Sequence, residues 1–265
     1  MAEGIIIVSG NSMYNDISIL IQGRLDATSL DKLPYYADIG KVVLSHDNHN
    51  DIDLLSEYNA HRYCETIVSN RIINADTIAN KGYIVKNYAN LGRPSTFFYS
   101  IYSTYHGLLN CRTKYTIKLR SDEFVENLEP MISRFLEDTS KVVCSNIFYK
   151  DCNDYRLHFG DHMFIGRTNK LYKAYQTIYN YYVYDILDSR LDMDEREKNE
   201  AEIILTKSIL LAYGMGITDE NYRNLIKVVD INDMKPYLVR YCGMGLKWQD
   251  DYDYRYSSKH HDDCQ

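Results

Sequence analysis

The chain of 265 residues is long enough to bury a substantial core, and its 45% hydrophobic and 25% charged residues are typical of a soluble globular protein. Its net charge of −7 argues against a general nucleic-acid binder, which needs a basic surface. The six cysteines include no Cys-x-x-Cys pair, which argues against a metal cluster or a disulfide framework and favours a reducing, cytoplasmic setting. The apolar run at residues 5–8 is far too short for a signal sequence or a membrane span, so no transmembrane segment is expected.

The first part of the chain alternates short apolar runs with polar turns, a pattern that indicates buried strands. The run at residues 17–21, for example, lies between the polar turn at residues 9–12 and the loop Gln22-Gly23-Arg24. The runs expected to form strands are residues 5–8, 17–21, 41–45, 65–69 and 83–85.

A helix is predicted to begin at Pro94, because proline suits the first helical position. Apolar residues then recur at helical spacing, and Gly107 falls inside this pattern near its end. The charge-dense residues 188–199 are expected to form a mobile surface loop. Further strands are expected at residues 115–119, 141–145 and 162–166, and further helices at residues 171–182 and 202–213, the last closed by Gly214.

This alternation predicts a single α/β domain over residues 1–265, with a mixed, mostly parallel central sheet flanked by helices. We expect the first half, about residues 1–125, to bind a nucleotide, and the second half, about residues 126–265, to be more helical. The chain has neither a Gly-x-Gly-x-x-Gly loop after a strand nor a Gly-x-x-x-x-Gly-Lys-Ser/Thr loop. A dinucleotide or P-loop site therefore has no support, and any phosphate must be held by a metal ion and cationic side chains.

The most informative segment is the end of the predicted strand at residues 115–119, where an apolar run opens into charge. Lys118 and Arg120 are followed by Asp122 and Glu123. Open α/β sheets build their sites at the carboxyl ends of strands, where carboxylates can hold a divalent cation and cations can hold phosphate. An alternative of equal weight is a surface turn in which Arg120 pairs locally with one of the two carboxylates.

Other polar clusters allow a functional and a structural interpretation. Asn90-Leu91-Gly92-Arg93 precedes the predicted helix and can be an anion site or a helix cap. Asp161 stands between His158 and His162 and can be a general base or an ordinary loop aspartate. Glu202 opens a helix, where the helix dipole alone favours a carboxylate. The loop at residues 46–51 is rich in histidine and aspartate but fits no zinc pattern.

In their order along the chain, these pieces resemble the WavE lipopolysaccharide-synthesis family of glycosyltransferases. The resemblance spans about residues 17–215. The blocks that carry it are residues 17–23, 41–45, 90–96, 107–108, 114–122, 160–166 and 200–202. It implies a GT-A-like fold, in which a nucleotide-binding half is joined to an acceptor-binding half. Such enzymes usually hold a divalent metal on an Asp-x-Asp motif, whereas this chain has Arg120 at the first position, so only Asp122 is matched.

The resemblance implies a glycosyltransferase that moves a sugar from a nucleotide-sugar donor, with a UDP-sugar favoured, to a glycan acceptor. Mn²⁺ or Mg²⁺ would be held by Asp122 with Glu123 nearby, because these cations prefer oxygen ligands and bridge phosphates. In an inverting reaction a carboxylate must deprotonate the acceptor, with Asp161 the first choice and Glu202 the second. The remaining candidate residues are Arg93, Lys118 and Arg120 as phosphate contacts, and Gln22 and Gly23 as the lining of the nucleotide pocket.

Two other functions stay open from the sequence. A sugar-nucleotide nucleotidyltransferase also uses strand-end carboxylates and a metal, although the glycine-rich, basic N-terminal signature of that class is missing. A non-catalytic glycan- or nucleotide-binding module is favoured only by the missing first acidic position at Arg120.

Overall fold

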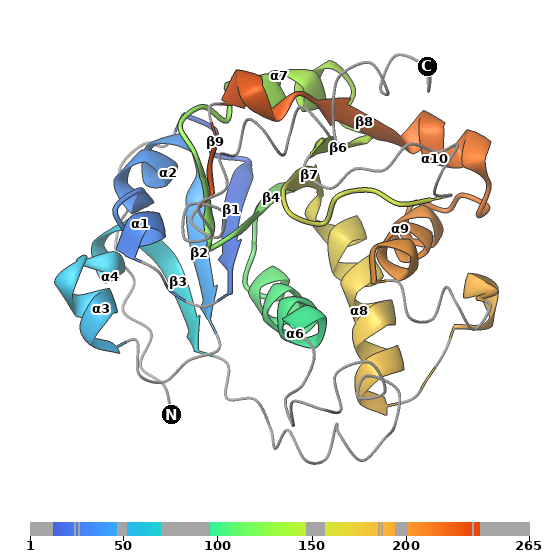
Figure 1. Cartoon of the computed structure of the whole chain (residues 1–265), viewed down its shortest axis with the longest axis horizontal. Helices are drawn as coiled ribbons and strands as arrows, with labels where there is room; N and C mark the ends of the chain where they lie inside the picture. The colour runs from blue at the N-terminus through green and yellow to red at the C-terminus, as the bar shows by residue number, and fades with distance from the viewer. Residues whose placement is uncertain are drawn as a thin grey trace.

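The computed structural model describes residues 13–23, 25, 27–46, 52–69, 96–146, 157–184, 186, 188–193, 201–234 and 236–238. Their central feature is a seven-stranded sheet with helices on both faces (Figure 1). The predicted fold class, a mixed and mostly parallel α/β sheet flanked by helices, is confirmed. The predicted strands at residues 5–8 and 83–85 and the segment around Arg93 lie outside the described residues.

The sheet has the strand order β3-β2-β1-β4-β7-β6-β8. Six strands run in one direction, and β7 alone is antiparallel to its neighbours β4 and β6. Strands from both halves of the chain therefore belong to one continuous sheet. The strands are β1 (Ile17–Gln22), β2 (Lys41–His46), β3 (Cys64–Ser69), β4 (Tyr115–Arg120), β6 (Val142–Ser145), β7 (Phe164–Arg167) and β8 (Ile226–Val229).

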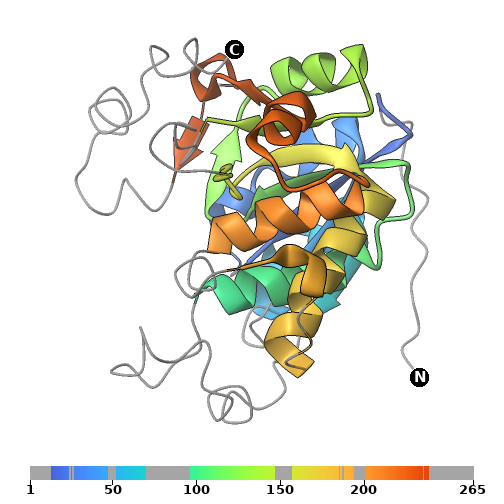
Figure 2. The ribbon, with the colours of Figure 1, turned by 90° about the vertical axis from the view of Figure 1, so that its right-hand side faces the viewer.

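The two faces of the sheet pack against different sets of helices, because successive strand residues point to opposite sides. In β1, Ile17, Ile19 and Ile21 belong to the core under α1, α2, α3, α4 and α7. Leu20 points the other way, into the core under α6, α8, α9 and α10 (Figure 2 shows α6, α8 and α9 side by side over the sheet). The helices are α1 (Ala27–Leu30), α2 (Leu33–Ile39), α3 (Ile52–Glu57), α4 (Ala60–Tyr63), α6 (Thr96–Leu108), α7 (Glu129–Glu137), α8 (Thr168–Tyr184), α9 (Ala201–Ala212) and α10 (Asp219–Leu225).

Gly107 explains how closely α6 lies against the sheet. A Cβ atom at this position would lie 2.3 Å from Cδ1 of Leu20 in β1. A glycine inside a helix loses stability relative to alanine by roughly 0.5–1 kcal/mol, and here it allows the close approach of helix and strand.

A second, two-stranded sheet joins β5 (Glu123–Val125) and β9 (Pro236–Leu238) in antiparallel fashion. Because β5 follows β4 after two residues, this small sheet continues directly from the charged end of β4. Two short 3₁₀ turns complete the described structure, η3 (Ser189–Leu191) and η5 (Ile231–Met234).

Most predicted elements in the described part of the chain are confirmed, including β1, β2, β3, β4, β6, α6, α8 and α9. The expectation of a mobile surface loop at residues 188–199 needs correction where the structure describes it. Residues 189–191 form η3, Leu191 is fully buried, and Nζ of Lys207 donates a hydrogen bond to the carbonyl oxygen of Asp192 at 2.9 Å. Besides the buried Leu191, Met193 in this charged run packs against the core, and η3 contacts α9.

Candidate functional site

The site forms where the order of the strands in the sheet reverses. From β1 the chain adds β2 and then β3 on one side, whereas β4 pairs with the other side of β1. In open α/β sheets ligands bind outside the carboxyl ends of the strands at such a switch point. Gln22 at the end of β1 lies opposite Arg120 at the end of β4, and the amide of Ser121 donates a hydrogen bond to the carbonyl oxygen of Gln22 at 2.8 Å. The two segments that carry most of the predicted donor residues are therefore direct neighbours.

Gly23 is required by the backbone at this switch point. Its φ of 122° lies in a region that side chains rarely allow, and a Cβ atom there would lie 2.7 Å from Oγ of Ser121. The neighbouring Gln22 side chain is buried, and its Oε1 atom has no hydrogen-bond partner in the described structure. A buried polar atom without a partner is costly, and it is often explained by water or a ligand that the structure does not contain.

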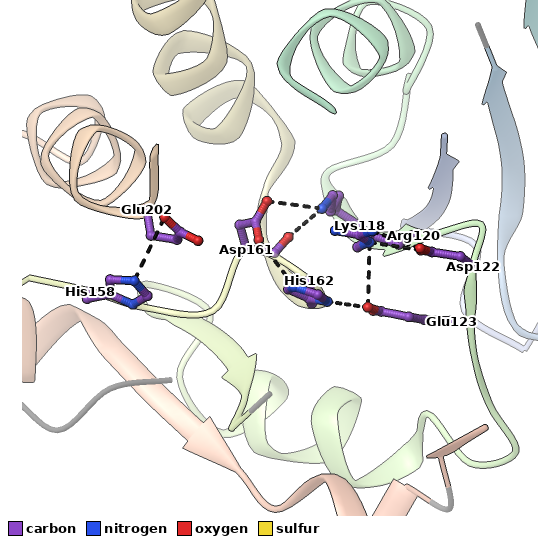
Figure 3. A network of polar contacts seen from close by, with 8 residues as sticks. All are labelled: Lys118, Arg120, Asp122, Glu123, His158, Asp161, His162 and Glu202. Carbon is purple, nitrogen blue, oxygen red and sulfur yellow. Dashed lines mark hydrogen bonds and ion pairs between the residues drawn. The ribbon is translucent and has the colours of Figure 1, made fainter. Parts of the chain in front are cut away.

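Arg120 and Asp122 form a bidentate ion pair at the end of β4 (Figure 3). Nε and NH2 of Arg120 each donate to one carboxylate oxygen of Asp122, both at 2.8 Å. Burial alone would raise the pKa of Asp122, but the guanidinium outweighs burial and holds that pKa below its usual value. The predicted phosphate contact and the predicted metal ligand thus pair with each other, as in the local ion pair that the sequence left open.

Glu123 at the start of β5 also contacts the guanidinium of Arg120, but its side chain is buried. Its Oε1 is 3.5 Å from Nε of Arg120, and it also forms a short hydrogen bond with Nδ1 of His162. Its second oxygen, Oε2, is buried and has no partner in the described structure. Glu123 therefore links the end of β4 to the segment that precedes β7.

Lys118 lies two residues before Arg120 in β4, and its side chain is fully buried. Its Nζ donates to the carbonyl oxygen of Asp161 and is 4.0 Å from Oδ2 of the same residue. Burial lowers the pKa of Lys118, and Asp161 opposes that shift. The predicted phosphate contact is thus placed against the predicted general base.

Asp161 stands between two histidines, each of which is held by a glutamate. Nε2 of His162 is 3.8 Å from Oδ1 of Asp161, and His162 is bound by Glu123 on its other nitrogen. His158 is 3.8 Å from Oε2 of Glu202. Burial would raise the pKa of Asp161, but the charge of Lys118, followed by that of His162, holds it below the usual value. At neutral pH Asp161 is therefore a buried, ionised carboxylate.

The backbone that carries Asp161 is constrained. Leu157 has a φ of 59°, a left-handed conformation that costs a non-glycine residue about 1–2 kcal/mol. The amide of Phe159 donates to Oγ1 of Thr206 in α9 at 3.4 Å. Backbone strain of this kind is often found beside functional side chains.

Glu202 lies in the first turn of α9, and its carboxylate is 3.8 Å from His158, three residues before Asp161. Its side chain is about one third exposed, at 32%, whereas that of Asp161 is 12% exposed. Of the two predicted bases, Asp161 is the one with a described contact to a cation of β4, Lys118.

The oxygen ligands that the end of β4 offers a divalent cation are the carboxylates of Asp122 and Glu123. No group of three or more His, Cys, Asp and Glu residues in the described ranges is placed to hold a metal ion. Asp122 and Glu123, however, both approach one guanidinium nitrogen, and Oε2 of Glu123 lacks a partner within the described structure. Mg²⁺ and Mn²⁺ commonly take one or two carboxylates and complete their coordination with phosphate and water.

The network adds two residues to those predicted: His158, which pairs with Glu202, and His162, which connects Glu123 with Asp161. The position of His162 directly after Asp161 was a signal, but nothing in a strand-end pattern shows which carboxylate a histidine will contact. Arg93 and the polar residues at 47, 49 and 51 lie outside the described ranges. His46 is buried at the end of β2.

Comparisons with known proteins give likenesses to solved structures only. No protein-family model and no curated protein matches the chain. The chain is similar to S. aureus TarS 1–349, with 16% identity and a TM-score of 0.40 over 81% of this chain and 58% of that one. It is similar to the glycosyltransferase GlyE of Streptococcus pneumoniae TIGR4, with 9% identity and a TM-score of 0.44 over 94% of this chain and 53% of that one. It is also similar to mouse xyloside xylosyltransferase 1, with 10% identity and a TM-score of 0.36 over 82% and 86%.

The chain spans about half the length of the TarS and GlyE chains that it matches. At identities and TM-scores this low, the likenesses do not by themselves show a shared activity. The resemblance to the WavE family stays a prediction. No helix in the described part of the chain is long and apolar enough to cross a membrane.

Proposed function

We propose that this protein is a glycosyltransferase that moves a sugar from a nucleotide-sugar donor to a hydroxyl group of a glycan acceptor. The observation that carries the proposal is one continuous network at the β1/β4 switch point (Figure 3). It runs from the partly exposed Arg120–Asp122 pair through Glu123 and His162 to the buried, ionised Asp161. A cation for a diphosphate and a base for a hydroxyl thus belong to the same site.

The donor side of this site is the junction of β1 and β4. Gln22 and Gly23 would line the nucleotide, and Arg120 would contact the diphosphate with charge-assisted hydrogen bonds. Arg120 is 23% exposed and already carries two N–H donors aimed at carboxylate oxygens, the same geometry that phosphate oxygens accept. We favour a UDP-sugar, on the resemblance alone.

The acceptor side is Asp161. In an inverting transfer the acceptor oxygen forms a bond with the anomeric carbon as the bond to the diphosphate breaks, and the diphosphate leaves with the electron pair. The hydroxyl proton must go to a base, and an ionised carboxylate within hydrogen-bond reach can take it. We propose that Asp161 takes this proton, and Glu202 would act on it indirectly, through His158.

The charges in the network favour a metal ion on the donor side. Lys118 and Arg120 face three carboxylates, those of Asp122, Glu123 and Asp161, so the site is not positive before a diphosphate arrives. We propose that Asp122 and Glu123 hold Mn²⁺ or Mg²⁺. When bound, the cation would neutralise charge that develops on the leaving diphosphate.

The experiment is a thermal-shift screen of nucleotide sugars with Mn²⁺, followed by transfer assays with the donors that stabilise the protein, since a ligand that binds the folded state more tightly stabilises it more. Transfer that is lost in a folded Asp122→Ala variant would support the proposal. An Asp122→Ala variant that folds and keeps wild-type transfer would refute it. Release of pyrophosphate from a nucleoside triphosphate and a sugar phosphate would instead favour a nucleotidyltransferase.

One observation favours a binding module as the second candidate. Both oxygens of Asp122 are already engaged by Arg120, so a nucleotide and metal must compete with an existing ion pair. Calorimetry with UDP, with and without Mn²⁺, separates the two candidates. Binding without turnover of any donor would favour the module.

A further inference from the structure

A lysine occupies a position in β4 where the strand pattern calls for an apolar side chain. Lys118 lies in register between Leu20 of β1 and Phe164 of β7, and all three side chains are fully buried. This row belongs to the face covered by α6 and α8. A buried cation is costly unless it is paired, so its presence at such a position calls for a specific partner.

That partner is Asp161. Nζ of Lys118 donates to the main-chain carbonyl oxygen of Asp161 and lies 4.0 Å from its Oδ2 atom. The same Nζ is 5.7 Å from the centroid of the Phe164 ring, which closes the site from the neighbouring strand. Lys118 therefore contacts both the backbone and the carboxylate of one residue and has no exposed surface from which to reach a phosphate.

We propose that Lys118 is a positioning residue, which holds the Asp161 carboxylate in place against the acceptor hydroxyl, rather than a contact to the donor diphosphate. The inference rests on the proposed glycosyl transfer, in which Asp161 takes the proton. It changes the role expected from the sequence, where Lys118 and Arg120 were both phosphate contacts. Neighbouring residues of a strand point to opposite faces, so Lys118 and Arg120, two positions apart, share a face. They differ in depth, because the Lys118 side chain is fully buried and that of Arg120 is partly exposed.

Several charged and titratable groups surround Asp161, and Lys118 contributes most among them. Its own segment supplies His158 and His162, β4 supplies Arg120 beside Lys118, and α8 supplies the phenol of Tyr175. Burial raises the pKa of Asp161, and the charge of Lys118 is the largest influence that lowers it. Without Lys118 the carboxylate would therefore bind a proton at higher pH.

The test compares a Lys118→Met variant with a matched Lys170→Met control. Lys170 at the start of α8 makes the same kinds of contact away from the site, because its Nζ donates to the carbonyl oxygen of Ala212 at 2.8 Å and is 5.8 Å from the centroid of the Tyr213 ring. Each protein is assayed for UDP affinity by calorimetry and for the pH dependence of kcat.

The expected result for Lys118→Met is UDP affinity within a few-fold of the wild type, together with a loss of kcat at neutral pH of about 100-fold, because a catalytic group misplaced by about 1 Å can lose that much rate. The acid limb of its kcat profile should move up by about one pH unit or more, since an opposite charge at this distance lowers a carboxyl pKa by about 1–3 units. Lys170→Met should show neither effect. A weaker UDP affinity with an unmoved acid limb would assign Lys118 to the phosphate and overturn the proposal.

A second measurement needs neither the variant nor turnover. A ¹³C carboxyl titration of the wild-type protein should show that Asp161 titrates below about 3.9, the ordinary value for aspartate. A value above that would overturn the proposal even if Lys118→Met does not fold. A wild-type protein that transfers no sugar to any acceptor would refute the proposed function, and the titration would still decide whether Asp161 is held in its charged form.

Discussion

The pairing of Lys118 with Asp161 predicts that an Asp161→Asn substitution damages stability and activity for separate reasons. Asparagine keeps the size of the side chain but removes the charge, which leaves Lys118 as a fully buried cation without its counter-ion. Removing one partner of a buried ion pair destabilises a protein by about 3–5 kcal/mol. Lys118 keeps its hydrogen bond to the carbonyl oxygen at position 161, so we expect the lower end of that range, about 3 kcal/mol.

A second substitution separates the two effects. The double variant Lys118→Met/Asp161→Asn has no unpaired cation. Its methionine is an apolar side chain between the buried apolar residues Leu20 and Phe164. We expect the double variant to recover at least half of the stability that Asp161→Asn loses, and to recover none of the transfer activity.

The assay is urea unfolding of the wild type, the two single variants and the double variant at one pH, which gives the coupling energy of the pair. Contacting residues typically show coupling of about 0.5–3 kcal/mol. A coupling energy near zero, or a double variant less stable than Asp161→Asn, would refute the view that these two residues form one buried unit. Recovery of transfer in the double variant would refute the role of Asp161 as the base.

Three further predictions concern the donor side and the response to pH. An Asp122→Ala variant should stay folded and lose most of the Mn²⁺-dependent gain in UDP affinity, and calorimetry that shows the same gain as in the wild type would contradict the assignment of Asp122 to the metal. A Gly23→Ala variant should be less stable by about 1–3 kcal/mol. Adding Ser121→Ala should remove the clash with Oγ but not the backbone strain, so thermal unfolding should show partial recovery, and full recovery would mean that φ at this position is not constrained. Because the folded-state pKa of Asp161 is lowered, its stabilising effect is present above the usual carboxyl pKa and is lost as pH falls through the folded value. The free energy of unfolding of the wild type should therefore fall more steeply in acid than that of Asp161→Asn, and parallel curves would argue against the lowered pKa.

The sheet was predictable because apolar runs with turn residues at both ends report burial directly. β1, β2 and β4 appear within a residue or so of their expected ends, since each is buried along nearly its whole length. β5 was not expected, because a strand of three residues is too short to show the alternation of apolar and polar residues. Its described pairing is with β9, which is distant in the sequence. α7 was missed although Met131, Ile132 and Phe135 recur at helical spacing, a signal that was available in the sequence.

The site was predictable in its location but not in its pairings. Arg120 and Asp122 were expected at the carboxyl end of a strand, where open α/β sheets build their sites. Asp161 precedes β7 and reaches the same edge because β7 is antiparallel to β4. The partners of each charge depend on the register between β4 and β7 and on the turn that leads into β5, and neither can be read from spacing along the chain. For this reason the sequence suggested that Lys118 and Arg120 both contact phosphate. In the structure Lys118 is buried against Asp161, whereas Arg120 is partly exposed.

The central claim is that one network at the β1/β4 switch point both binds a nucleotide sugar and removes the acceptor proton. Its most direct test is sugar transfer by the wild type and by Asp161→Asn, measured together with UDP affinity of the same two proteins. We predict that the variant binds UDP within a few-fold of the wild type and transfers sugar at least about 100-fold more slowly. Unchanged transfer in the variant, or loss of UDP binding that accounts for the whole effect, would contradict the claim.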